Sequence, residues 1–439
     1  MSEATAAGWT ALPLGDVADL QLGKMLDKAR NLDGRPLHYL RNINVRWGSF
    51  DTDDLATMRF TDDEAAKFSI RDGDVLVCEG GEPGRAAVWR GGATDLKFQK
   101  AIHRVRPGES LSSDWIAFFL RYAATTGSLT DSFTGTTIKH LPAQALAAVT
   151  IPVPPLAEQR RIVARIEALF ARTRRARADL ERVAPLARLH RERSLAAAFP
   201  APEDAGDGTT VANLLAEPAA NGISVRGSDE PPGIRALRLD ALRLDGLDLS
   251  RVRYIEIPEA KARRLCVKRG DFFVSRGNGT LSLLARGAFA EEPEAPTVFP
   301  DTMIRLRFNR SRVHADWLAL AWGAPAVRMQ IVARAKTTAG IWKVSQADLE
   351  TVRLLAPGLQ EQSNTAKRVR RQLTGVLRAE HEATRALALL DRLEQSILAR
   401  AFRGELVPQD RADEPAAAIL ARQRATPTTS TRRRTRAPP

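Results

Sequence analysis

The stretch FSIRDGDVLV at residues 68–77 decides the architecture, because the chain repeats its pattern as LCVKRGDFFV at residues 265–274. Three further blocks recur in the same order: FQKAIHRVR (98–106) with FPDTMIRLR (299–307), DWIA (114–117) with DWLA (316–319), and PPLAEQ (154–159) with PGLQEQ (357–362). The offset between the copies drifts only from 270 − 73 = 197 to 362 − 159 = 203 residues. Ordered blocks at a nearly constant offset indicate a duplication. We therefore expect two similar globular domains, each followed by a similar segment.

Each globular half has the pattern of a mixed α/β domain. Short apolar runs at Asp74–Cys78 and Asp271–Ser275 suit buried strands, and a glycine-rich turn follows the first of them at residues 80–84. The Asp-Trp blocks have the pattern of helix starts, with Ser113 or Asp114 as the cap in the first copy. The expected fold class is therefore α+β.

Long amphipathic segments follow the PPLAEQ and PGLQEQ blocks. In the first, apolar or small residues recur with gaps of 4 and 3: Ile162, Ile166, Leu169, Thr173, Ala176, Leu180 and Val183. The second has the same spacing with one polar interruption: Val369, Leu373, Val376, Glu380, Ala383, Leu387 and Leu390. Heptad spacing predicts a long helix with one narrow apolar seam, which needs a helical partner. We expect the two helices to pair as a long antiparallel coiled coil between two pseudo-symmetric domains. The alternative is that each helix packs separately on its own domain.

These patterns divide the chain into five segments. They are a first domain (1–152), a first long helix (153–204), a second domain (205–355), a second long helix (356–406) and a basic tail (407–439). The tail is an Ala/Pro/Arg/Thr mixture with almost no branched or aromatic apolar residue after Leu420. A segment of that composition cannot bury enough apolar surface to fold, so we expect the tail to be disordered.

Composition narrows the class of partner. The 439 residues carry a net charge of +14, which suggests a polyanion such as nucleic acid, although an arginine-rich coding bias is the alternative. The two cysteines, Cys78 and Cys266, can form neither a disulfide framework nor a four-thiolate zinc site. The N-terminus lacks a signal-peptide pattern, and no apolar run is long enough to span a bilayer. We expect a cytoplasmic protein without membrane contact.

Motifs of catalysis are missing from the sequence. It has no G-x-x-x-x-G-K-[ST] phosphate loop, no G-x-G-x-x-G dinucleotide pattern and no G-x-S-x-G nucleophile turn. It also lacks the [DN]-P-P-[YF] quartet with which amino-methyltransferases hold a flipped adenine. The six histidines are scattered without the spacing of metal ligands. We therefore expect a recognition or scaffold protein that is not an enzyme and holds no metal.

Four stretches resemble signatures of the specificity subunits of type I restriction-modification systems. They are GDVLVCEGGEPGR (73–85), TGTTIKHL (134–141), IPVPPLAEQ (151–159) and QSILARAFRGEL (395–406), and the resemblance covers residues 9–410. The second half departs from the pattern, since RGNGT (276–280) replaces the glycine-rich turn and AGIWK (339–343) replaces TTIKH. Divergence of this kind is expected if the two domains read different DNA half-sites.

The resemblance implies a DNA-specificity subunit with two target-recognition domains, held apart by paired helices, that read the halves of a bipartite double-stranded DNA site. The family's chemistry lies in its partners. Two modification subunits use S-adenosylmethionine to methylate adenine N6 of a flipped base. Restriction (translocase) subunits use ATP and Mg²⁺. The resemblance therefore implies that this chain binds no cofactor of its own.

Candidate DNA contacts are basic, amide, hydroxyl and aromatic side chains in polar loops or beside these signatures, because polar groups of this kind reach base edges and phosphates. In the first domain they are Arg41, Asn42, Asn44, Lys97, Lys100, Thr136, Thr137, Lys139 and His140. In the second domain they are Arg276, Asn278, Lys336, Thr337, Trp342 and Lys343. Contacts with a helical partner are assigned to Ile162, Ile166, Leu169, Leu180, Val183, Leu373, Val376, Leu387 and Leu390.

Two other functions stay open on the residues alone. One is a coiled-coil scaffold whose duplicated domains bind other proteins, and the other is a stand-alone DNA-binding regulator. A dimeric regulator obtains its two-fold symmetry from two chains, whereas this chain carries its own pseudo-dimer.

Overall fold

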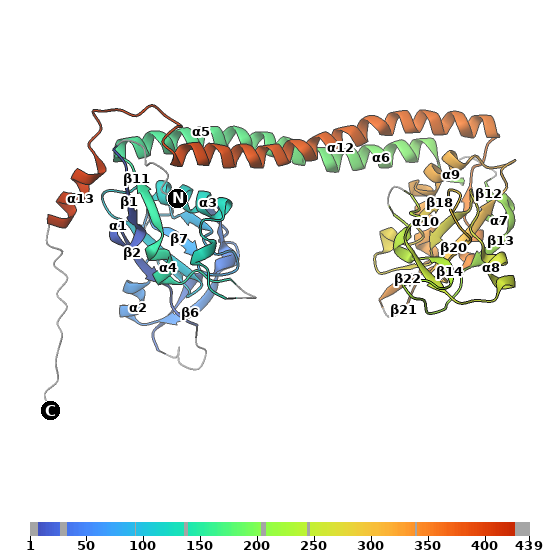
Figure 1. Ribbon diagram of the computed structural model, residues 1–439, viewed down its shortest axis with the longest axis horizontal. Helices are drawn as coiled ribbons and strands as arrows, with labels where there is room; N and C mark the ends of the chain where they lie inside the picture. Colours follow the sequence, from blue (N-terminus) through green and yellow to red (C-terminus); the bar gives the residue numbers. More distant parts are fainter. Residues whose placement is uncertain are drawn as a thin grey trace. The chain divides into compact units, whose positions relative to one another are not determined.

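The structure is a computed structural model that describes residues 8–26, 33–92, 94–135, 139–202, 208–243, 246–338 and 340–425. The chain divides into two compact units: the first comprises the residues up to Asp179 together with those from Ala386 onward, and the second comprises Leu180–Arg385. Each unit contains one lobe of mixed helices and strands and segments of the long helices (Figure 1). The expected α+β class is confirmed.

The first lobe is built on a four-stranded antiparallel sheet. Its strand order is β2-β10-β7-β8, with the bounds Ala18–Leu22, Ile102–Pro107, Val75–Cys78 and Ala86–Val88. Helix α3 (Ser113–Thr126) packs on this sheet through the fully buried Trp115, Ile116 and Leu120. The cap of α3 is Ser112, which accepts a hydrogen bond from the N–H of Trp115, and not Ser113 or Asp114 as expected.

A smaller sheet completes the core of the first lobe. Strands β6 (Ala56–Phe60), β3 (Arg35–Leu40) and β9 (Lys97–Phe98) form it, and Phe60, Phe68 and Phe98 pack in its core. Strand β1 (Thr10–Pro13) pairs with β11 (Thr150–Val153), the strand that leads into the first long helix. The remaining elements are α1 (Leu14–Val17), η1 (Asn42–Asn44), β4 (Val45–Arg46), β5 (Ser49–Phe50), α2 (Asp62–Lys67), η2 (Thr130–Ser132) and α4 (Ala143–Ala148).

The second lobe repeats this topology. Its main sheet is β13-β20-β16-β18, with the bounds Leu215–Asn221, Met303–Phe308, Phe272–Ser275 and Gly287–Phe289. Its smaller sheet is β15-β14-β19, with the bounds Val252–Ile255, Ile234–Leu237 and Thr297–Val298, and β12 (Thr209–Thr210) pairs with β23 (Arg353–Leu354). A further sheet is β17-β22-β21, with the bounds Gly277–Asn278, Ile341–Lys343 and Lys336–Thr338. The other elements are α7 (Val211–Leu214), η4 (Leu239–Ala241), α8 (Glu259–Leu265), η5 (Leu281–Leu283), α9 (Ala315–Trp322), α10 (Pro325–Arg334) and α11 (Gln346–Glu350).

An ion pair with a buried carboxylate stands at the same place in both lobes. In the first, Asp74 accepts two hydrogen bonds from the guanidinium of Arg106, at 2.7 and 2.8 Å. In the second, Asp271 accepts two from Arg307, at 2.5 and 2.8 Å. These hydrogen bonds raise the pKa of each arginine. Because a bidentate pair has a fixed geometry, each one anchors the start of a central strand, β7 or β16.

The long helices pair antiparallel. Helix α5 spans Leu156–Glu181, α6 spans Val183–Ala198 and α12 spans Leu359–Phe402. In the first unit, Thr173 donates a hydrogen bond to Glu394 and Arg177 donates one to Asp391, each at 2.6 Å. Residue numbers therefore rise along α5 as they fall along α12. In the second unit, the end of α6 packs on the start of α12.

The seam residues assigned to a helical partner face inward. Ile162, Ile166 and Leu373 are buried, and the half-buried residues are Leu169, Leu180, Val183, Val376, Leu387 and Leu390. The 4–3 spacing places these side chains along one side of each helix. The prediction of a coiled coil within one chain is confirmed in each unit.

The first long helix is interrupted, which differs from the continuous segment 153–204 that we expected. Helix α5 ends at Glu181 and α6 begins at Val183. Pro185 has no N–H to donate to the carbonyl oxygen of Glu181, so one backbone hydrogen bond of the helix is missing at this point.

The segment after α12 is partly folded, which corrects the expected disorder from residue 407 onward. Asp413 pairs with Arg161 at 2.6 Å. Helix α13 (Ala416–Ala425) follows, and its Ala416 and Leu420 lie in the main core of the first unit. Two apolar residues four positions apart share one face of a helix, which explains why this segment packs. Residues 426–439 lie outside the described residues.

Candidate nucleic-acid interface

In the first lobe, strand β7 leads into a closely held turn at residues 79–84. Asn42 donates from Nδ2 to the carbonyl oxygen of Gly80 at 3.1 Å. Arg85 donates to the carboxylate of Glu82 at 2.7 Å and to the carbonyl oxygen of Asn42 at 2.8 Å. Gly81 has a φ of +81°, and a Cβ there would lie 2.6 Å from Asn42 Nδ2, so this position requires glycine. These contacts hold the turn in one conformation.

Backbone groups of Thr134, His140 and Leu141 form hydrogen bonds next to this turn. Thr134 and His140 exchange backbone hydrogen bonds at 2.8 and 2.9 Å, and the N–H of Leu141 donates to the carbonyl oxygen of Glu79 at 2.7 Å. Nδ1 of His140 lies 3.5 Å from Oε2 of Glu79. We call the surface of Glu79, Gly80, Thr134, Lys139 and His140 the first edge.

A buried histidine, His103, forms a hydrogen bond with the backbone next to the first edge. Nε2 of His103 lies 2.8 Å from the carbonyl oxygen of Leu141, and the His103 side chain is fully buried. Burial lowers the pKa of His103, which favours the neutral imidazole. A neutral ring with its proton on Nε2 donates to Leu141 and positions the residue that follows His140.

The second lobe carries the sheet β17-β22-β21 at the equivalent place. On the central strand β22, Lys343 pairs with Gly277 of β17 on one side and with Lys336 of β21 on the other. Trp342, the preceding residue of β22, pairs in the same way with Asn278 and Thr337. The N–H of Val344 donates to the carbonyl oxygen of Arg276, as that of Leu141 does to Glu79 in the first lobe. We call the surface of these residues the second edge: Arg276, Asn278, Lys336, Thr337, Trp342 and Lys343.

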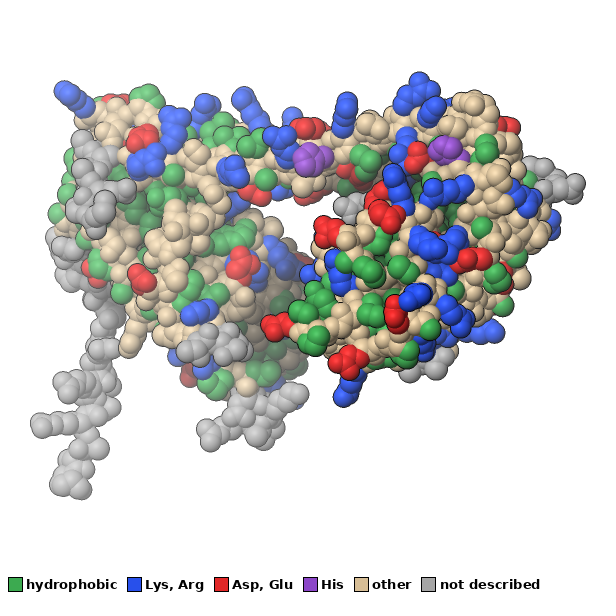
Figure 2. Space-filling view, turned by 45° about the vertical axis from the view of Figure 1, so that its right-hand side comes forward, with side chains coloured by type: hydrophobic (Ala, Val, Ile, Leu, Met, Phe, Trp, Pro, Cys, Tyr) green, Lys and Arg blue, Asp and Glu red, His purple; other side chains and the backbone are tan. Residues whose placement is uncertain are grey.

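The structure brings together all six candidates of the second domain. Lys336, Thr337 and Lys343 are exposed, whereas Arg276, Asn278 and Trp342 are half-buried. Lysine, arginine, asparagine and threonine side chains on a narrow β-ribbon can reach base edges in a major groove about 12 Å wide. Figure 2 shows Lys and Arg side chains interspersed with acidic ones over the visible face of the second lobe, on the right of the view.

The candidates of the first domain are divided. Lys100 and Lys139 are exposed and His140 is half-buried, so these three side chains are accessible. Arg41 and Asn42 are half-buried and serve the fold, because Arg41 pairs with Asp54 at 2.7 Å and Asn42 holds the turn. Thr136 and Thr137 lie outside the described residues.

Two candidates of the first domain are corrected by the structure, because they are buried. Asn44 is 2% exposed, and its Nδ2 donates to the carbonyl oxygens of Asp51 and Asp54 at 2.9 Å each. Lys97 is 3% exposed, and burial lowers its pKa. Side chains enclosed in this way cannot reach a base edge, so Asn44 and Lys97 leave the candidate interface.

Two residues of the first edge were missed by the sequence reasoning. Glu79 stands where the second lobe has Arg276, and Thr134 stands where it has Lys336, as the matching backbone pairs show. The repeat offset could have found both of them. A carboxylate in a groove accepts a hydrogen bond from cytosine N4, so Glu79 has the chemistry of a base-reading residue.

Two kinds of site are missing from the part of the chain that the structure describes. It contains no group of three or more His, Cys, Asp or Glu side chains placed to hold a metal ion. None of its helices combines the length and the apolar character needed to cross a membrane.

Comparison with known proteins gives one family. The model of the type I restriction modification DNA specificity domain matches residues 7–182. The EcoKI specificity subunit of Escherichia coli (strain K12) is 26% identical over 428 residues, which cover 93% of this chain and 91% of the relative. The StySPI specificity subunit of Salmonella potsdam is 27% identical over 431 residues, with the same two shares covered.

Solved structures share the fold. A chain from a study of complex assembly and conformational transition of the type I R-M system has a TM-score of 0.73 and 21% identity, covering 92% of this chain and 100% of its own. The HsdS subunit from Thermoanaerobacter tengcongensis has a TM-score of 0.58 and 20% identity, with the same two shares covered. The duplicated lobes and the antiparallel helices agree with these matches: the chain is similar over most of its length to specificity subunits of type I restriction-modification systems, and residues 7–182 match the DNA specificity domain of that family.

Proposed function

We propose that this chain selects the DNA sequence for a type I restriction-modification complex by reading a bipartite target, one half with each lobe. The observation that carries the proposal is the pair of edges. In both lobes the residues after the central strand pair with a later segment through matching backbone contacts, yet the two lobes present different side chains there. Base contacts specify a sequence, so two different edges on one frame suit two different half-sites.

The paired helices support a fixed spacing between the half-sites. Helix α12 has 44 residues, which at about 1.5 Å per residue span about 66 Å. Half-sites about one duplex turn apart need readers about 34 Å apart or more. We infer that the helix pair acts as the spacer.

The chemistry belongs to other subunits in this proposal. Two modification subunits would bring S-adenosylmethionine for transfer of a methyl group to adenine N6, and restriction (translocase) subunits would bring ATP and Mg²⁺. The chain itself would supply sequence selection and docking surfaces. The relatives support this division, since they are described as specificity subunits.

Co-expression with the cognate methyltransferase subunit tests the proposal. We expect a stable complex with two copies of that subunit, and N6-methyladenine at a split motif when the host genome is sequenced for methylation. A scaffold or a stand-alone regulator would give neither result. Failure to copurify a methyltransferase, together with a methylome without a split motif, would contradict the proposal.

A further inference from the structure

The first lobe has a short turn, η1, in which the usual distribution of polar and apolar side chains is reversed. Of its two asparagines, Asn44 is only 2% exposed and Asn42 is half-buried, whereas Ile43 between them is 48% exposed. Scattered apolar residues occur on every protein surface, and the informative features are buried polar groups and exposed apolar groups that occur together. This turn combines both within three residues.

The polar side chains of the turn hold its shape. Oδ1 of Asn44 accepts a hydrogen bond from the N–H of Arg41 at 2.9 Å, and its Nδ2 donates to two backbone carbonyl groups of the following loop. The carbonyl oxygen of Asn42 accepts a hydrogen bond from Arg85 at 2.8 Å. Nδ2 of Asn42 donates to the carbonyl oxygen of Gly80 at 3.1 Å, which joins the turn to the first edge. The exposed isoleucine therefore has a fixed place beside the first edge.

The second lobe repeats the turn and again exposes an apolar side chain from it. The N–H of Ala241 donates to the carbonyl oxygen of Arg238 at 3.0 Å, as that of Asn44 does to Arg41 at 2.9 Å. Leu239 in this second turn is 40% exposed. A single apolar residue on a surface needs no explanation. Its recurrence in the same turn of both lobes indicates a function.

The chemistry of the major groove identifies a partner for such a side chain. Every base edge there presents hydrogen-bond donors or acceptors, and thymine alone adds a C5-methyl group. Polar residues of the first edge, such as Glu79 and Lys139, suit the donors and acceptors. The methyl group is recognised by an apolar side chain that removes it from water. Methylation at adenine N6 requires an A·T pair, so the split motif contains at least one thymine.

We infer that Ile43 contacts the 5-methyl group of a thymine in the half-site that the first lobe reads, an inference that rests on the proposed function. The contact distinguishes thymine from cytosine, which has no methyl group at C5. Burial of one group of this size corresponds to a change in affinity of about fourfold. Ile43 is thus a specificity-determining residue between two asparagines that hold its turn.

Duplexes without single methyl groups test the inference, with the full-length chain in its complex with the modification subunits. The probe contains the split motif found by methylation sequencing, and each of its thymines is replaced in turn by deoxyuridine. Uracil pairs with adenine as thymine does, so each replacement removes one methyl group and no hydrogen-bonding group. Fluorescence anisotropy compares the wild type with Ile43→Ala and Ile43→Val. Leu239→Ala is the matched control, because it removes an exposed apolar side chain from the corresponding turn of the other lobe.

We expect the wild type to bind the duplex with uracil at the contacted position about fourfold more weakly than the thymine duplex. Ile43→Ala should bind the thymine duplex about fourfold more weakly and should not respond to uracil at that position. Loss of both groups together should therefore cost no more than loss of either one. Ile43→Val keeps a branched apolar side chain and should keep most of the response, and Leu239→Ala should keep all of it.

An Ile43→Ala variant that responds to every uracil as the wild type does overturns the inference and leaves the proposed function standing. The same conclusion holds if this variant loses affinity equally for the motif and for an unrelated duplex, because Ile43 then contacts the DNA backbone or another subunit. A wild type that gives no split motif overturns the proposed function, and the inference with it. Thermal melting checks that each variant folds, and Ile43→Ser, which also removes the apolar contact, replaces Ile43→Ala if that variant unfolds.

Discussion

The two lobes agree in their interiors and differ at their edges. Inside, Gln159 accepts a hydrogen bond from the N–H of Ser112 at 2.9 Å and donates to the carbonyl oxygens of Ser110 and Pro154. Gln362 makes the corresponding three bonds to His314, Arg312 and Pro357. At the edges the side chains differ. Glu79 of the first lobe corresponds in the repeat to Arg276 of the second, and His140 corresponds to Lys343.

This difference shows which parts of the lobe specify the fold. Buried polar groups need hydrogen-bond partners. The buried glutamine and the Asp–Arg pair of each lobe therefore fix the positions of the strands and helix starts that they connect. The edges are held by backbone hydrogen bonds, which tolerate different side chains. A lobe of this design can change what it reads without changing how it folds.

The largest expected effect concerns the part that the lobes share. Asp74→Ala leaves the half-buried Arg106 without its paired carboxylate and should cost about 3–5 kcal/mol of stability, whereas Asp271→Ala leaves Arg307 paired with Glu217 at 2.8 Å and should cost less. Hydrogen exchange of β7 and β16 should show the loss in the substituted lobe. The exposed Asp53→Ala is the control, with an expected change within about 0.5 kcal/mol. A lobe that tolerates the loss of its aspartate would contradict the shared role.

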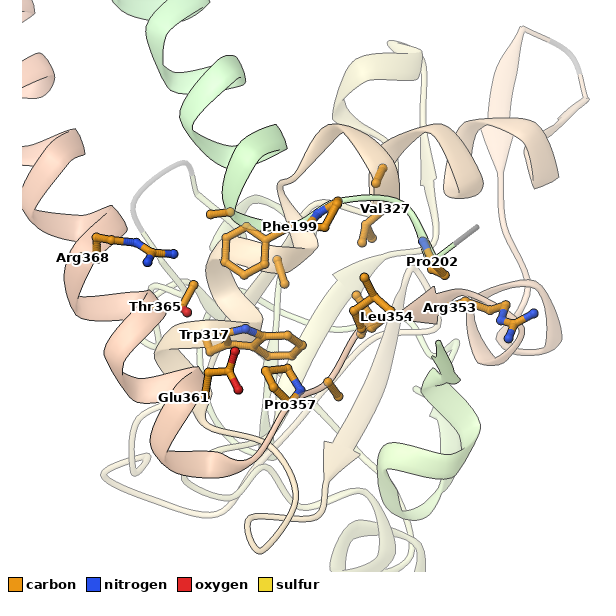
Figure 3. Close-up of a pocket in the computed structure, with 16 residues that line it drawn as sticks. Phe199, Pro202, Trp317, Val327, Arg353, Leu354, Pro357, Glu361, Thr365 and Arg368 are labelled. Atoms are coloured by element: carbon orange, nitrogen blue, oxygen red, sulfur yellow. The ribbon is translucent and has the colours of Figure 1, made fainter. Parts of the chain in front are cut away.

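The C-terminal ends of α12 and α6 should differ in how much they contribute to the stability of the fold. The centre of the Phe402 ring lies 4.6 Å from that of Trp115, 5.5 Å from that of Phe119 and 5.1 Å from that of Tyr122. The centre of the Phe199 ring lies 5.9 Å from that of Trp317 (Figure 3). Phe402→Ala removes contacts with three aromatic rings and should cost about 3–5 kcal/mol of stability, and Phe199→Ala, at the corresponding end of α6, should cost less. Urea denaturation compares the two variants, and a larger loss of stability for Phe199→Ala than for Phe402→Ala would contradict this order.

Salt dependence should separate phosphate contacts from the rest of the second edge. Lys336→Ala and Lys343→Ala should each reduce the slope of log K against log salt by about 1 if their ammonium groups neutralise phosphates. Lys261, which is exposed on α8 outside the edge, is the control and should leave the slope unchanged. Fluorescence anisotropy with duplex DNA measures these slopes. Unchanged slopes in both edge variants would remove the two lysines from the interface.

The smallest expected effect is the response of helix α13 and the segment before it to pH. A hydrogen bond with Arg161 lowers the pKa of Asp413 from the ordinary value of 3.8. A carboxylate with a lowered pKa stabilises the folded form above that ordinary value and loses this contribution as the pH falls through the lowered one. Hydrogen exchange of α13 should therefore increase below about pH 4. Arg161→Ala should remove that step, and an identical profile in this variant would contradict the role of the ion pair.

Much of the fold could be predicted from the sequence because its signals are periodic. The repeat predicted two lobes, and the 4–3 spacing predicted the helices and their seam. Pro185 and the apolar pair Ala416 and Leu420 were readable signals as well, and they account for the break after α5 and for α13. The composition of a long segment indicates neither the break nor the short helix, because both depend on single positions.

The candidate site was harder to predict, because exposure depends on how loops fold back. Asn44 stands in a polar stretch of the sequence that is typical of a surface, yet its amide donates hydrogen bonds to the carbonyl oxygens of Asp51 and Asp54 and is buried. Lys97 is enclosed in the same unexpected way next to Phe98. In the second lobe the candidates were chosen by their positions in the repeat, and all six came together on one sheet.

An exchange of edges tests most directly the claim that each lobe reads its own half-site. In the triple variant Arg276→Glu, Lys336→Thr and Lys343→His, the second edge carries the first lobe's side chains at three matching positions. The account predicts that methylation sequencing of a host with this variant and the modification subunit shows a split motif changed in one half and unchanged in the other. A motif that keeps both halves, or changes in both, would contradict independent reading by the two lobes.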